Sequence, residues 1–258
     1  MLRQIVYAAV VEDCLALAAA AGGMPDAIRE IAEKNPDFAH LGNVDGMDDA
    51  FYQAFADKIK ENRTTGFDPD MVGQQLAFQA GRLCRTATDA VFAGLPSDKD
   101  AAMMQDARVF RARFLADDAA IAALGLSRED AVAQMTEMLR AFVKRAVMRT
   151  HTFKPGYEDI HVWLARWYNK SAQYDNEVGP LARMIIDPDP ALVARAVTAP
   201  GFFDASEPLV KAAKALRGKA AAPADGIAAA LSAQPVSLYA RALKQSYESL
   251  AAYAATLS

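Results

Sequence analysis

The residues best suited to chemistry are concentrated between His151 and Asn176. This stretch holds two of the three histidines of the chain, both tryptophans and three of the eight tyrosines. Histidine titrates near neutral pH and tyrosine can donate or accept a proton, so both can act in general acid–base catalysis. No other stretch of the sequence concentrates so many groups that can titrate, bind a metal or stack on a ligand.

His161 and Tyr157 are the first candidates for catalysis. They are four residues apart, which places them on one face of a predicted helix. The small Ala165, one turn further, would leave room for a ligand beside the imidazole, and Asp159 or Asp175 can assist proton transfer. The alternative interpretation is that His161 is an ordinary core residue at the edge of an apolar stripe.

Three further residues of this stretch are candidates for ligand binding. Trp163 and Trp167 are one turn apart, so they can wall an apolar pocket or simply pack in the core. His151 follows a predicted helix C-terminus, where the helix dipole favours the protonated imidazole. That position suits a ligand contact as well as a plain helix cap.

A second pair, Arg85 and Asp89, lies on the helix predicted over residues 69–93. One turn apart, the two side chains can form an intrahelical ion pair. Alternatively, Arg85 offers its planar guanidinium to a phosphate or carboxylate ligand, and Asp89 serves as an acid–base group. We predict that this helix and the one carrying Tyr157 and His161 border one cavity, since an ordinary core excludes unpaired charge.

Two segments resemble the zinc-dependent phospholipase C family and the related single-strand nucleases. Residues 76–96, LAFQAGRLCRTATDAVFAGLP, resemble the central family helix, with matches at Gly81, Asp89 and Pro96. Residues 40–55, HLGNVDGMDDAFYQAF, resemble a second family segment, with matches at Leu41, Gly42, Asp48 and Tyr52. The resemblance implies a compact helical fold and, in the family, zinc-dependent hydrolysis of phosphodiesters.

The chain departs from the family at the metal ligands. Arg85 stands where the family has a histidine, and a guanidinium has only donors and cannot bind a metal. Met47 stands where proline is usual, and three histidines in total cannot supply a site built on several. We therefore predict no metal site and no cofactor, but metal-independent acid–base chemistry on a small or lipid-like substrate in an apolar pocket. The alternatives are a non-catalytic helical protein that binds a ligand or partner, and a zinc-dependent phosphodiester hydrolase.

Helical periodicity along the chain predicts the elements that must position these residues. Apolar residues recur three and four positions apart, and no alternating run long enough for a strand is present in the sequence. We predict an all-α fold of about ten helices in one compact domain spanning residues 1–258. Residues 35–48 are rich in turn formers and are expected to form a loop. Residues 216–224 are expected to be mobile before the C-terminal helix.

Composition excludes several classes of function. The chain has 258 residues, 53% hydrophobic and 23% charged, with a net charge of −4 and two cysteines. This balance gives no basic face for nucleic acid, and two cysteines do not make a disulfide framework. No apolar run is long enough to span a bilayer, and the acids Glu12 and Asp13 interrupt the apolar N-terminal stretch as no signal peptide would. We expect a cytoplasmic protein whose partner is a small-molecule substrate or ligand.

Overall fold

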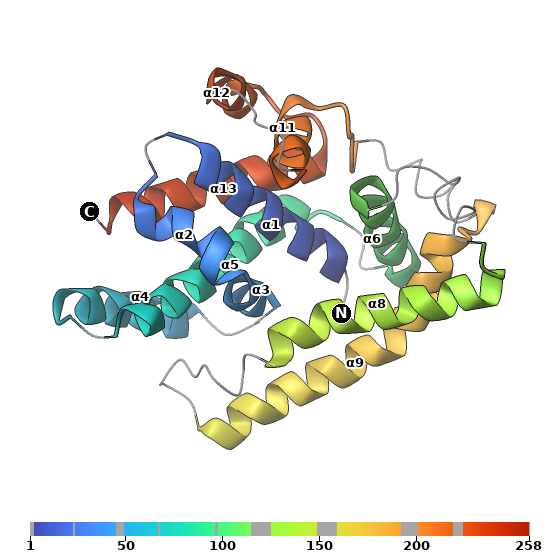
Figure 1. The fold of residues 1–258 in the computed structure, drawn as a ribbon, viewed down its shortest axis with the longest axis horizontal. Coiled ribbons are helices and arrows are strands. Elements are labelled where there is room, and N and C mark those ends of the chain that lie inside the picture. Colours follow the sequence, from blue (N-terminus) through green and yellow to red (C-terminus); the bar gives the residue numbers. More distant parts are fainter. Residues whose placement is uncertain are drawn as a thin grey trace.

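A computed structural model describes residues 3–22, 24–44, 49–66, 68–95, 98–114, 125–148, 159–191, 201–218 and 224–257. Within these ranges the chain forms eleven helices with defined bounds and no β-strand (Figure 1). They are α1 (Gln4–Ala20), α2 (Asp26–Lys34), α3 (Pro36–Val44), α4 (Asp49–Thr64), α5 (Pro69–Phe92), α6 (Lys99–Phe114), α8 (Arg128–Met148), α9 (Ile160–Ile186), α11 (Pro208–Arg217), α12 (Ala224–Ser232) and α13 (Leu238–Ala255). The predicted all-α fold is confirmed.

Helix α1 is the central element of the fold. It contacts α2, α3, α5, α6, α11, α12 and α13 (Figure 1). Most of its residues are buried. A helix buried on nearly all sides is apolar on nearly all sides, which explains its sequence. The larger core surrounds α1, α5 and α13, whereas a second cluster joins the beginning of α1 to α6, α8 and α9. Among the described helices, none has both the length and the apolar character needed to cross a membrane.

Side-chain caps fix the beginnings of the two helices that carry the predicted site. At α5, Asp68 accepts the backbone N–H of Asp70 at 3.0 Å, and Pro69 occupies the first turn, where its missing N–H costs nothing. At α9, Asp159 accepts the backbone N–H of His161 at 2.8 Å. Helix α9 continues to Ile186, beyond the end of the stretch from His151 to Asn176.

The beginning of α1 is fixed by a buried carboxylate on α6. Asp106 accepts the backbone N–H of Val6 at 2.8 Å, and the N–H groups of Gln4 and Ile5 also face it. Burial raises the pKa of Asp106 to about 7, against the opposing effect of these N–H groups and of the Arg3 guanidinium. Ionised Asp106 suits the positive end of α1, but it has little access to water.

Two glycines let α3 and α5 approach each other closely. A Cβ on Gly42 would lie 1.9 Å from the carbonyl oxygen of Phe78, and one on Gly81 would lie 1.8 Å from the carbonyl oxygen of Ala39. Any side chain at either position would force the helices apart. The crossing is therefore specified by these two glycines, and it brings the segments that carry the family resemblance together.

The prediction of a loop over residues 35–48 is wrong for residues 36–44, which form α3. Pro36 is suited to the first turn of a helix, and Asp37 favours the same end because of the helix dipole. Gly42 looks like a turn former in the sequence but serves the contact with α5. Residues 45–48 lie outside the described ranges, as does most of the predicted mobile segment 216–224; α11 ends at Arg217 and α12 begins at Ala224.

Candidate functional site

His161, the first predicted catalytic residue, is exposed in the first turn of α9. Its backbone N–H is capped by Asp159, which explains why the helix begins there. Tyr157 and His151 lie outside the described residues. Because His161 is exposed and its predicted partner Tyr157 lies outside the described residues, the catalytic role of His161 stays a prediction.

Trp163 and Trp167 are core residues. Their side chains are buried, and their rings meet edge to face with centroids 5.5 Å apart. Trp163 also contacts the ring of Phe78 at 6.3 Å between centroids, which ties α9 to α5. In this arrangement the two indoles hold helices together, and ligand binding by them stays a prediction.

Arg85 and Asp89 form the ion pair that their spacing allows. The Nε atom of Arg85 lies 2.8 Å from a carboxylate oxygen of Asp89, and the Tyr7 hydroxyl donates a hydrogen bond to the other oxygen. The guanidinium also lies over the Tyr7 ring, 3.8 Å from its centroid, and Nη1 reaches the carbonyl oxygen of Asn43 at 3.5 Å. Burial raises the pKa of Tyr7, so its hydroxyl stays protonated. Arg85 thus links α1, α3 and α5.

Lys170 of α9 contacts the C-terminal end of α3. Its Nζ donates to the carbonyl oxygen of Val44 at 2.8 Å. Lys170 lies nine residues after His161, about 13 Å along a helix axis. The structure therefore brings Arg85 and Lys170 to neighbouring carbonyls at the C-terminus of α3, where cations are favoured by the helix dipole.

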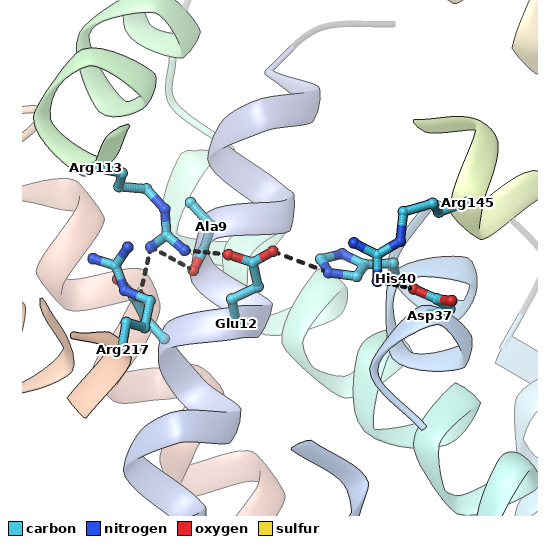
Figure 2. Close-up of polar contacts among 8 residues, drawn as sticks. Ala9, Glu12, Asp37, His40, Arg113, Arg145 and Arg217 are labelled. Atoms are coloured by element: carbon cyan, nitrogen blue, oxygen red, sulfur yellow. Dashed lines mark hydrogen bonds and ion pairs between the residues drawn. The ribbon is translucent and has the colours of Figure 1, made fainter. Parts of the chain in front are cut away.

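Helix α1 also carries a buried charge network that was not predicted from the sequence, and Figure 2 shows its two arginines, Arg113 and Arg217. Asp13 is 1% exposed. Arg113 of α6 donates to its Oδ1 at 2.5 Å, and Tyr239 of α13 donates to its Oδ2 at 2.7 Å. Arg217 of α11 lies 2.7 Å from the same Oδ1 as an ion pair without hydrogen-bond geometry. Three helices are thereby joined to α1 through one carboxylate.

Glu12 carries this network toward the surface (Figure 2). One carboxylate oxygen accepts a hydrogen bond from Arg113, and the other lies 3.2 Å from Nε2 of His40 on α3. Burial acts to raise the pKa of Glu12, but the contact with His40 and the charge of Arg113 outweigh it and lower the pKa to about 2. Glu12 is therefore a carboxylate at neutral pH. The side chains of Glu12 and His40 are 29% and 14% exposed, against 3% for Arg113.

A second ion pair stands beside His40 on α3 (Figure 2). Asp37 precedes His40 by one turn, so the two side chains share a helix face. Its carboxylate lies 3.0 Å from Nη2 of Arg145, which comes from α8 and is mostly exposed. His40 is thus placed between the partly buried carboxylate of Glu12 on one side and the exposed guanidinium of Arg145 on the other.

This arrangement has the chemical parts of an acid–base site. Glu12 and Asp13 are balanced by Arg113 and Arg217, so the network is neutral without any charge on His40. A neutral imidazole that donates a hydrogen bond from its Nε2–H to Glu12 carries its basic lone pair on Nδ1. The carboxylate would also stabilise the imidazolium formed when the ring takes up a proton.

The sequence contains a signal for this network. Glu12 and Asp13 are adjacent acids within a helix that is otherwise almost wholly apolar. Buried carboxylates need cationic partners, so such a pair predicts ion pairs inside the fold. Which cations would pair with them could not be predicted, because Arg113 and Arg217 lie a hundred or more residues away.

Comparisons with protein-family models, curated proteins and solved structures find no match for this chain. Among the described residues, no cluster of three or more histidine, cysteine, aspartate or glutamate side chains is arranged to hold a metal ion. The candidate site therefore stands on its own geometry.

Proposed function

We propose that the protein is an enzyme that carries out metal-independent acid–base chemistry on a small-molecule or lipid-like substrate, with His40 as the acid–base group. The observation that carries the proposal is the Glu12–His40 pair, at 3.2 Å, in which both side chains are partly exposed to solvent. Glu12 orients the imidazole. Arg145 is placed to attract an anionic group of the substrate, because its charge is mostly exposed beside His40.

The family resemblance supports the scaffold of this proposal. The two resembling segments meet where α3 crosses α5, and His40 is carried by α3. Arg85 takes the place of a family metal ligand and is engaged by Asp89 and the Tyr7 ring. Acid–base chemistry at His40 does not require zinc at the positions of Arg85 and Asp89.

Turnover with a panel of chromogenic carboxylic esters, phosphomonoesters and phosphodiesters tests the proposal. We expect hydrolysis that persists in a chelator and falls by at least about a hundredfold in His40→Gln, the usual contribution of a general acid–base group. His161→Gln is the matched control, because His161 is exposed and lies at the start of another helix. Loss of turnover in His161→Gln with full activity in His40→Gln would move the catalytic role to His161.

Elemental analysis of the purified protein separates the alternatives. Zinc at one or more ions per chain, with activity lost in a chelator and restored by zinc, would favour a phosphodiester hydrolase. Absence of turnover on every substrate, together with a co-purifying organic molecule detected by mass spectrometry, would favour a non-catalytic ligand-binding protein.

A further inference from the structure

A cavity of about 310 Å³ lies among α2, the C-terminal end of α4 and the first turns of α5. None of its lining residues belongs to the His40 site. One wall is the face of α2 that carries Ala27, Glu30 and Ile31, and the opposite wall is the face of α5 that carries Val72 and Leu76. The cavity is thus a gap between the facing sides of α2 and α5.

The floor of this cavity is apolar. Ile31, Val72 and Leu76 are buried side chains of the main core. Gly73 contributes no side chain, so the wall of α5 is recessed there, and a Cβ would come within 3.0 Å of the Asn35 amide nitrogen. An apolar recess of this kind favours a ligand with a hydrocarbon body.

The rim of the cavity holds one arginine without an acidic partner in the described part of the chain. Arg63 donates from Nη1 to the carbonyl oxygen of Leu257 at 2.6 Å, which fixes the guanidinium without an ion pair to any described carboxylate. Glu30, the carboxylate that lines the cavity, is paired instead with Lys34 at 2.9 Å. Asn35 adds an amide that can donate to an oxygen.

From this combination we propose that the cavity binds a monocarboxylate with a short hydrocarbon tail, held through its carboxylate by Arg63 and through its tail by the apolar floor. The volume sets the size. A volume of about 310 Å³ is at the small end of the range for ligand pockets, which suits a short chain such as that of octanoate. Charge-assisted hydrogen bonds from a guanidinium to a carboxylate select this head group over a neutral or cationic one.

Titration calorimetry with octanoate tests the site on the full chain. Octan-1-ol and octylamine, which share the tail but not the anion, are the comparison ligands. We expect octanoate to bind with a dissociation constant of about 1 mM or tighter and the other two to bind at least about tenfold more weakly. No heat of binding for octanoate, or equal affinity for the three compounds, would overturn the proposal.

Three variants locate the binding. Arg63→Gln should weaken octanoate binding by about tenfold or more, and Ala27→Phe should abolish it by filling the cavity from α2. Lys60→Gln is the matched control, because Lys60 is an exposed cation on the same helix as Arg63 but does not line the cavity. Unchanged affinity in both Arg63→Gln and Ala27→Phe would place octanoate elsewhere and refute the site. Ala27→Phe leaves the Arg63–Leu257 contact intact, so it tests the cavity even if Arg63→Gln folds poorly.

Discussion

Replacing Asp13 by asparagine tests whether the inner half of the charge network holds the fold together. Asp13 is 1% exposed and faces Arg113, Arg217 and the hydroxyl of Tyr239. Asparagine keeps the size of the side chain but removes its charge, leaving two arginines near α1 with Glu12 as their only remaining carboxylate in the network. Breaking a buried ion pair in this way costs about 3–5 kcal/mol, because a desolvated charge is left without compensation.

Glu12→Gln is the natural comparison for Asp13→Asn. Glu12 contacts the same Arg113 but is 29% exposed, so water can solvate the groups it leaves behind. We expect a loss of about 1–2 kcal/mol in the free energy of unfolding, since partly exposed pairs are screened. Urea unfolding at pH 7, monitored by circular dichroism, measures the free energy of unfolding of each variant. The two variants must have the same dependence on denaturant concentration for the values to be compared. A smaller loss for Asp13→Asn than for Glu12→Gln would refute the division into a structural inner half and an accessible outer half.

Two further predictions concern other parts of the fold. Burial raises the pKa of Asp106 from 3.8 to about 7, so folding takes up a proton at pH values between these two. The contribution of protonated Asp106 to the free energy of unfolding is therefore full below about pH 4 and is lost as the pH rises through 7. This contribution is at most about 4 kcal/mol, and the stability of Asp106→Asn, measured by urea unfolding across pH 4–8, should not show this loss. The same dependence of stability on pH in wild type and variant would contradict the prediction. Gly81→Ala places a Cβ 1.8 Å from the carbonyl oxygen of Ala39 and should lower stability by about 3 kcal/mol in urea unfolding, whereas Gly94→Ala, with no atom within 4 Å of the new Cβ, should cost less than about 1 kcal/mol. Equal losses in the two glycine variants would show that the α3–α5 crossing is not the tight contact described.

The sequence predicted the fold class well because helical periodicity is a local property. The ends of α5 were predicted within one residue, since Asp68, Pro69 and the Gly94 turn carry standard start and stop signals. Helix α3 was not predicted because proline and glycine, here Pro36 and Gly42, occur both in loops and in helices. Proline both begins helices and occurs in loops, and a glycine needed for close packing looks like a turn former.

The candidate site was much less predictable than the fold. The Arg85–Asp89 pair follows from a spacing of four residues and was foreseen as one of two interpretations. The Glu12–His40 pair joins residues on different helices, and nothing in the local pattern of either helix specifies their contact. Concentration of aromatic and titratable residues drew attention to His161 and Trp163, yet the indole is core and the imidazole is exposed.

The proposed role of His40 as an acid–base group held by Glu12 is tested by the ratio of kcat/KM between wild type and His40→Gln. The substrate is one that the wild type turns over in the presence of a chelator. The unfolding curve of the variant must match that of the wild type, so that the ratio reports chemistry and not folding. We expect a ratio of at least about a hundred, with a smaller loss in Glu12→Gln because the imidazole remains. A ratio near one in a fully folded variant would contradict it.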